Sequence, residues 1–392
     1  MQTTVNISPS ILDWVWQQVD ATSSAKAIDY LTKWRNGEQT PTFNQIEEVS
    51  RITSIPLGYF FLDTPPEENT KFVEYRTIDS VALNKPSRNL IDTMHDMDMI
   101  QEWTRDYLIA NDSSKIPFIG KYAGETDINF IANEVRRILS LKLDWYKDKK
   151  IKTADDSFRV IKNAISNNGV IVMISSTVGA NTHRLLDIDE FRAFTMIDDI
   201  APLIFINSND SANGKLFSLL HEFIHLCMGE NSLFNDRYSN GKNVKQIETI
   251  CNAVAAEILV PKTIFEREWN CAINQYDKEQ VIHILARIFV CGQTVIARKA
   301  YDLRFINYAL YDKIAKAAVA YYIETKKRKK EKQQGHPGYY TTKASQIDKR
   351  FIFMLAHSVV EGKTLYSDAF RLTHTNRSTF ESLINKIIGG GN

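Results

Sequence analysis

The chain has 392 residues, of which 44% are hydrophobic and 24% are charged, and its formal net charge is +1. A chain of this length and composition can bury substantial hydrophobic cores, and we expect two or three domains. The balanced charge excludes a general electrostatic attraction to nucleic acid or to a membrane surface.

Three features of the sequence bear on its location. The N-terminus lacks a basic segment followed by an apolar one, and no apolar stretch is long enough to span a bilayer. The four cysteines show no pairing typical of metal sites: Cys227, Cys251, Cys271 and Cys291. We therefore expect a cytoplasmic protein without a membrane partner, in which these thiols are reduced and buried.

Residues 1–66 are predicted to form a helical N-terminal domain. Gly37 is expected to end one helix, and Pro41-Thr42 to begin the next. The apolar stripe of this second helix consists of Ile46, Val49 and Ile52. A connecting segment follows over residues 67–125, with a helical stretch that contains Met94, Met97, Met99 and Ile100. Clustered methionines can form an adaptable binding surface, but a core-facing helix is the commoner explanation.

A small, twisted sheet is predicted within residues 126–265. Three short apolar runs indicate its strands: Val170–Ile174, Phe191–Met196 and Leu203–Ile206. We expect Phe191–Met196 to be an exposed edge strand, which could hold an extended peptide by strand addition.

His221, Glu222 and His225 form a His-Glu-x-x-His pattern within an apolar helix predicted over Gly214–Met228. Helical residues four apart share a face, so both imidazoles can point at one metal ion, with the glutamate beside them. In zinc peptidases the two histidines of this pattern bind Zn²⁺ and the glutamate is the general base. The alternative is an ordinary core helix with two satisfied histidines. Buried polar groups need partners, however, and a metal would supply one.

A second helix downstream offers a third ligand, since a catalytic zinc needs three protein ligands and one open position. The helical stretch that Pro261 ends carries Glu248 and Asn252 on one face. We predict that Glu248 is the third ligand and that Asn252 accepts the far ring N–H of a ligating histidine. Alternatively, Glu248 is a solvated carboxylate favoured by the helix dipole. Glu257 points away from this face and suits a structural role.

Residues 266–392 are predicted to form a helical C-terminal region. The one dense basic run, Lys326–Lys332, follows a helical stretch and precedes the loop Gly335–Gly338. A nucleic-acid patch is possible there, but a solvated helix end is the commoner explanation. The last residues, Gly389–Asn392, are expected to be frayed.

Two blocks of this sequence resemble the ImmA/IrrE family of zinc metallopeptidases. Residues 217–225 resemble the family's F-T-L-A-H-E-x-x-H block, and residues 248–261 resemble its E-x-x-A-N-x-F-A-A-E-L-L-M-P block. The departures from the family pattern remove neither a ligand nor the base: Ser218, Leu220, Cys251, Val254 and Val260.

By position, the resemblance implies that His221, His225 and Glu248 bind Zn²⁺ and that Glu222 is the catalytic base. It implies an α+β, mainly helical fold, with a zincin-like core and its small sheet between an N-terminal repressor-like domain and the helical C-terminal region. It also implies a biological role, the cleavage of a helix-turn-helix repressor that controls genes of mobile elements or stress responses.

The resemblance extends to the N-terminal domain. Residues 34–46 are similar to the signature W-E-x-G-x-x-x-P-T-x-x-Q-L, which closes a helix-turn-helix domain of the XRE type, and Phe72–Thr77 resembles the connecting segment of longer family members. A recognition helix needs polar and basic side chains facing the major groove, yet Ala21–Leu31 offers only Lys26. DNA binding and pairing with another repressor domain remain alternatives, and no DNA-binding residue is assigned.

Two classes of function follow. The first is a zinc endopeptidase acting on a helix-turn-helix repressor or an antitoxin-like partner; the second is a non-enzymatic regulator, binding DNA or a repressor, with a residual metal site. The intact ligand and base positions favour the first. A peptidase also needs a donor for the developing oxyanion, for which Tyr238 and His183 are candidates by their place in the sequence alone.

Overall fold

The computed structural model describes residues 4–19, 24–66, 86–229, 232–234, 246–331 and 339–388. These residues divide into two compact units, the first made of residues 4–66 and 86–92 and the second of the remainder. The boundaries predicted after residues 125 and 265 fall inside the second unit and stay predictions. Three segments named above lie outside the described residues: Phe72–Thr77, Gly335–Gly338 and Gly389–Asn392.

The first unit is helical, as predicted. Its elements are α1 (Pro9–Gln18), α2 (Ala25–Arg35), α3 (Phe43–Thr53) and the 3-10 turn η1 (Leu57–Phe61). Just after α2, Gly37 adopts a φ of +72°, a conformation that suits glycine. Thr42 and Gln45 form a capping box at the start of α3. Ile46 and Val49 of α3 are fully buried in the core of this unit, whereas Ile52, the third residue of the predicted apolar stripe, is only partly buried.

The second unit contains a mixed sheet with the strand order β1-β3-β2-β4. Its strands are β1 (Ile171–Ser175), β2 (Ala193–Met196), β3 (Leu203–Asn207) and β4 (Ser232–Phe234). β1 runs parallel to β3, whereas β2 runs antiparallel to both β3 and β4. The first three strands agree with the predicted runs, and β4 was not predicted from the sequence.

The prediction that Phe191–Met196 forms an exposed edge strand is wrong. β2 lies between β3 and β4, and all four of its residues are buried. The prediction fails because β4, which the sequence analysis did not identify, pairs with the free side of β2 and because covered layers of the fold meet both of its faces. The edges of the described sheet are β1 and β4.

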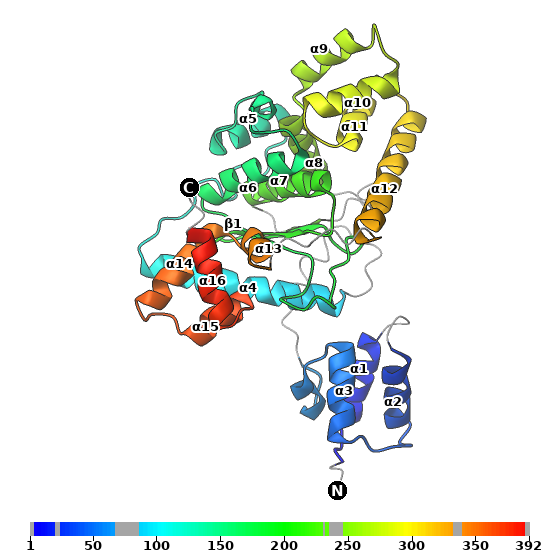
Figure 1. Cartoon of the computed structure of the whole chain (residues 1–392), viewed down its shortest axis with the longest axis vertical. Coiled ribbons are helices and arrows are strands. Elements are labelled where there is room, and N and C mark those ends of the chain that lie inside the picture. Colours follow the sequence, from blue (N-terminus) through cyan, green and yellow to red (C-terminus); the bar gives the residue numbers. More distant parts are fainter. Residues whose placement is uncertain are drawn as a thin grey trace. The chain divides into compact units, whose positions relative to one another are not determined.

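Helices cover both faces of this sheet (Figure 1). α6 (Ala154–Asn167) and α7 (Ala212–Met228) lie against one face, and α4 (Arg88–Ala110) lies against the other. Side chains alternate along each strand between these two layers. Those that pack into the core with α6 and α7 include Val172, Ile204 and Ile206. Those that meet α4 include Met173 and Phe205.

The methionine-rich stretch belongs to α4. Met94, Met97 and Ile100 are buried, so the core-facing explanation of this stretch is confirmed. The amide of Gln101 ties the same helix to the sheet region by donating to the carbonyl oxygens of Met196 and Ala201.

The remaining elements of the second unit are helical, and they confirm an α+β, mainly helical fold with a small sheet. Before and after the sheet lie α5 (Ile128–Ile138), η4 (Trp145–Lys147), α8 (Gln246–Leu259), α9 (Lys262–Ala272), α10 (Lys278–Ile288) and α11 (Gln293–Asp302). The C-terminal helices are α12 (Tyr308–Glu331), α13 (Tyr339–Gln346), α14 (Lys349–Val360), α15 (Tyr366–Thr373) and α16 (Arg377–Ile388). The basic run begins on α12, where Lys327 and Arg328 are exposed.

Within the described residues, no helix by itself has the length and apolar composition needed to cross a membrane. α10 and α11 reach that composition only as a pair, and they are bent by 120° relative to each other.

Asp348 fastens the C-terminal helices to the sheet. This fully buried residue caps α14, with Oδ1 accepting hydrogen bonds from the backbone N–H groups of Arg350 and Phe351. Its Oδ2 accepts from the Ser166 hydroxyl on α6, at 2.7 Å, and from the Val172 N–H on β1, at 3.2 Å. The carboxylate of Asp348 therefore connects α14 with both α6 and β1.

We expect Asp348→Ala to lower the free energy of unfolding by about 2–4 kcal/mol, because it removes a helix cap and leaves a buried hydroxyl and amide unpaired. Chemical denaturation measures the loss. Asp368→Ala is the matched control, since the ion pair that Asp368 forms with Arg371 is exposed to solvent, and its effect should stay within about 0.5 kcal/mol. Equal losses in the two variants would contradict the assigned role.

Candidate metal centre

The His-Glu-x-x-His pattern lies on α7, as predicted. Ser211 caps the N-terminus of this helix by accepting a hydrogen bond from the Gly214 N–H, and Gly229 ends it with a φ of +80°. The helix crosses the interior of the second unit between the sheet and α8. The three residues that define the His-Glu-x-x-His pattern are almost completely buried: His221, Glu222 and His225.

Two helices bring three potential ligand atoms together. Nε2 of His221 lies 3.0 Å from Nε2 of His225, and each of these atoms lies 3.1 Å from a different carboxylate oxygen of Glu248 on α8. Tetrahedral Zn²⁺ with nitrogen and oxygen ligands needs its donor atoms roughly 3.3 Å apart. Among the residues that the structure describes, this is the group of His, Cys, Asp and Glu side chains that could hold a metal ion.

The charges of this cluster favour a cation. Burial acts against ionisation of Glu248, but hydrogen bonds with His221 and His225 hold the pKa of its carboxyl well below its ordinary value. Two imidazole nitrogens that face each other cannot both accept, so a proton or a cation must lie between them. An ionised carboxylate and two converging nitrogens are a donor set that suits a divalent metal.

The hydrogen bond predicted between Asn252 and a ligating histidine is not formed. Oδ1 of Asn252 and Nδ1 of His225 are both buried, and neither has a hydrogen-bond partner among the described residues. The physical reason lies in the imidazole ring. α8 meets the Nε2 side of the rings through Glu248, so a residue on the same face of α8 does not reach the opposite, Nδ1 side.

Glu257 has a structural role. Its carboxylate accepts hydrogen bonds from the backbone N–H of Lys262, at the start of α9, and forms an ion pair with Lys299 at 2.5 Å. These contacts direct the carboxylate away from the histidine cluster.

The cysteines are all free, and three of them are buried as expected: Cys227, Cys251 and Cys291. Cys271 is exposed, which corrects the prediction that all four are buried. Burial raises the pKa of the Cys227 and Cys251 thiols, which keeps both thiols neutral near the cluster.

Thr195 on β2 makes a contact with Glu222 that the sequence analysis missed. This fully buried hydroxyl lies 2.5 Å from Glu222 Oε2 and 3.2 Å from the Glu222 carbonyl oxygen. A hydroxyl donates one proton, and the shorter distance indicates that the carboxylate receives it. The sequence did contain an indication of this contact, because Thr195 is the one polar residue in the apolar run Ala193–Met196.

The two oxyanion candidates stay predictions. His183 is exposed on the loop between β1 and β2, where its backbone N–H donates to the Asn181 side chain. Tyr238 lies outside the described residues.

Comparison with known protein families assigns the region around the histidine cluster to a class of protein domain. Residues 167–290 match the IrrE N-terminal-like domain of the Peptidase_M78 family. This part of the chain, which includes the whole histidine and glutamate cluster, is therefore a domain of the metallopeptidase type. The match supports the predicted ImmA/IrrE metallopeptidase family for this domain.

A second match lies near the C-terminus. Residues 347–386, which include α14 and α15, match a domain of unknown function, DUF8813. No curated protein and no solved structure matches the chain. The family assignment therefore rests on the domain at residues 167–290.

We expect Glu248→Ala to lower the affinity for a divalent metal at least tenfold, because the variant loses one of three converging donors. Elemental analysis and competition with a chromophoric chelator measure metal content and affinity. Glu257→Gln is the control, since it should lower thermal stability through the lost Lys299 pair while metal content stays unchanged. Retention of full metal content by Glu248→Ala would contradict the assignment.

Proposed function

We propose that this protein is a cytoplasmic, zinc-dependent endopeptidase that cleaves a regulatory protein, and thereby controls transcription or a stress or mobile-element response. The observation that carries the proposal is the convergence of His221, His225 and Glu248, with Glu222 beside them, inside a Peptidase_M78 domain. The proposed substrate, a helix-turn-helix repressor or an antitoxin-like partner, rests on the family resemblance of the sequence.

His221, His225 and Glu248 would hold the Zn²⁺ ion. When bound, Zn²⁺ lowers the pKa of a coordinated water and polarises the scissile carbonyl. Glu222 accepts the proton of the attacking water and passes it to the leaving amine. Because Thr195 holds Glu222 Oε2, the direction of the other carboxylate oxygen is set before the substrate arrives.

We propose that an extended segment of the substrate adds to β4. This strand is an edge of the described sheet, and its Ser232 pairs with Thr195, the residue that bonds Glu222. The edge therefore lies one strand away from the proposed base. Backbone hydrogen bonds along such an edge bind a peptide largely without regard to its side chains.

The alternative function is that of a non-enzymatic regulator in which the N-terminal unit binds DNA. The basic side chains of α2 favour a protein partner instead, because each of them forms an ion pair with an acidic side chain of the same unit. The pairs are Lys26 with Glu48, Lys33 with Asp29, and Arg35 with Asp13. We propose that this unit recognises the repressor rather than DNA.

The decisive variant is Glu222→Gln, which keeps the shape of the side chain but removes its basicity. We expect the rate of cleavage to fall by about 10²–10⁴ with the metal content unchanged. The measurement is co-expression with a repressor encoded beside the gene, followed by a purified cleavage assay. Equal processing by wild type and Glu222→Gln would overturn the peptidase proposal.

Thr195→Val tests whether the buried hydroxyl positions Glu222. We expect kcat to fall about 10–100-fold with little change in KM, since contacts that orient catalytic groups typically have effects of this size. Thr195→Ser, which keeps the hydroxyl, should recover most of the activity. A Thr195→Val enzyme as active as the wild type would exclude the positioning role.

A further inference from the structure

The charge of this chain is unevenly distributed, although its net value is only +1. In residues 326–392, thirteen lysines and arginines occur with only five aspartates and glutamates. Because the whole chain has 48 basic and 47 acidic residues, the part before residue 326 is acidic. A basic region within an otherwise acidic chain indicates that this region contacts a polyanion.

The DUF8813 region folds as three helices around a shared core (Figure 1). α14, α15 and α16 each pack against the other two, and the rings of Phe370 on α15 and Phe380 on α16 have their centroids 5.7 Å apart. All three helices contribute buried apolar side chains: Phe351, Leu355, Ala369, Leu372, Phe380 and Leu383. Three packed helices are also the framework of one class of helix-turn-helix domain.

The connection between α15 and α16 is a tight turn over residues 374–376, as in a helix-turn-helix motif. His374 ends α15 with a φ of +48°, in the left-handed conformation. Asn376 caps α16, because its Oδ1 accepts a hydrogen bond from the Thr379 N–H while the Thr379 hydroxyl accepts one from the Asn376 N–H. The chain itself therefore fixes both ends of this turn.

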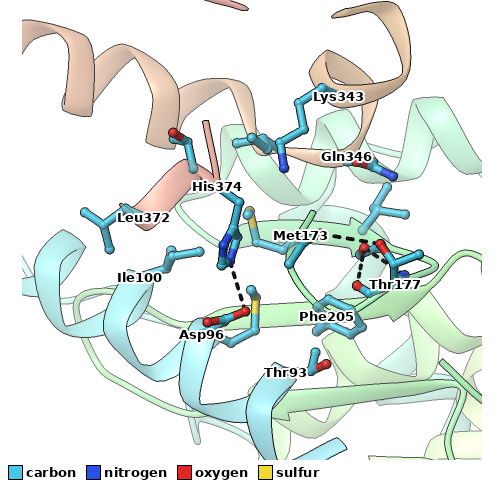
Figure 2. Close-up of a pocket in the computed structure, with 16 residues that line it drawn as sticks. Thr93, Asp96, Ile100, Met173, Thr177, Phe205, Lys343, Gln346, Leu372 and His374 are labelled. Carbon is cyan, nitrogen blue, oxygen red and sulfur yellow. Dashed lines mark hydrogen bonds and ion pairs between the residues drawn. The ribbon is translucent and has the colours of Figure 1, made fainter. Parts of the chain in front are cut away.

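The turn is also anchored to the rest of the second unit. Nε2 of His374 lies 2.9 Å from Asp96 Oδ2 on α4. Its ring packs against Gly179, where an added Cβ would lie 3.0 Å from two ring atoms. Figure 2 shows the ion pair at the wall of a cavity lined by α4, β1 and α13. α16 is thus held on a rigid support, which a helix that reads a ligand surface requires.

α16 presents a polar face to solvent. Its buried residues Phe380, Leu383 and Ile387 recur at helical spacing, and none of its described exposed side chains is a large apolar one. A helix that docks on a protein needs an exposed apolar stripe, whereas Arg, Asn, Ser and Glu side chains read base edges in the major groove and Lys contacts phosphates. The exposed and partly exposed polar residues of α16 are of these types: Arg377, Ser378, Glu381, Ser382, Asn385 and Lys386.

Basic side chains of this region are available to a ligand. Arg377 lies 3.5 Å from Glu381, but their side chains are 85% and 57% exposed, so the pair is weak. Lys349 and Lys386 are exposed and form no ion pair with the described residues. The N-terminal unit differs, because each basic side chain of its α2 is paired. Exposed cations without acidic partners can neutralise phosphates.

We propose that residues 347–388 form a DNA-binding helix-turn-helix module, with α16 as the recognition helix in the major groove of double-stranded DNA. Arg377, Ser378 and Glu381, near the N-terminus of α16, contact base edges, and Lys386 contacts a phosphate. The proposal is independent of the peptidase function. It assigns DNA binding to the C-terminal region rather than to the N-terminal unit.

Fluorescence anisotropy with the full-length protein and a labelled DNA duplex of mixed sequence tests the proposal. We expect a dissociation constant below about 100 µM at physiological salt and at least tenfold tighter binding at 50 mM salt, because neutralised phosphates release counterions. An RNA duplex of the same sequence should bind at least tenfold more weakly, since its narrow major groove does not admit a helix. Absence of DNA binding at 50 mM salt, or equal binding of the RNA duplex, would overturn the proposal.

The double variant Arg377→Ala with Lys386→Ala should weaken DNA binding at least tenfold. Both side chains are exposed, so the melting temperature should stay unchanged, and thermal denaturation checks this. The matched control, Lys33→Ala with Arg35→Ala, removes the same charge from α2 and should bind DNA as the wild type does. Equal losses in the two double variants, or a loss in the control alone, would contradict the assignment to α16.

Selection from a pool of random DNA duplexes tests whether α16 reads bases. We expect the wild type to enrich a common sequence motif. Ser378→Ala with Asn385→Ala, which changes no charge, should lose or alter this motif, whereas Lys386→Ala should keep it and bind every sequence more weakly. Enrichment of no motif by the wild type, or of the same motif by the Ser378→Ala, Asn385→Ala variant, would exclude α16 as a recognition helix.

Discussion

The contact of Glu248 with His221 and His225 determines how the centre of this molecule is built. It places one carboxylate and two imidazoles in a largely apolar interior, where each polar group must find a partner. The surrounding structure meets this requirement by fixing two helices relative to each other. α7 is packed between the sheet and α8, and its ends are set by a serine cap and a glycine stop. A modest displacement of either helix would separate the three donor atoms.

Local sequence patterns predicted much of this arrangement. Apolar periodicity and helix-ending residues predicted the positions of α7 and α8. The spacing of His221, His225 and Glu248 along these helices predicted that their side chains would lie together, and in the structure they do. Long-range pairing could not be predicted in the same way. The sequence identifies β2 as a strand but not its neighbours, so its central position and the bond from Thr195 to Glu222 emerged only from the fold. Asn252 shares a helix face with Glu248, yet ring geometry separates it from the histidine nitrogen it was expected to meet.

The sheet separates two kinds of chemistry. On the α7 face, Thr195 extends from β2 to the carboxylate of Glu222. On the α4 face, Met173 and Phe205 form part of the wall of a cavity that also contains Lys343. Neighbouring residues of β3 therefore face different layers: Ile204 packs into the core with α7 and Phe205 lines the cavity, because alternate side chains of a strand point in opposite directions. This alternation allows four short strands to support both a metal cluster and a junction between domains.

Asp348 has a consequence beyond the attachment of α14. β1 is an edge of the sheet, and the outward N–H of Val172 would be open to a strand from another molecule if nothing covered it. The carboxylate of Asp348 already accepts that hydrogen. The residue that begins a helix thus also blocks a position where a second copy of the chain could template aggregation, and it leaves growth of the sheet to the side of β4.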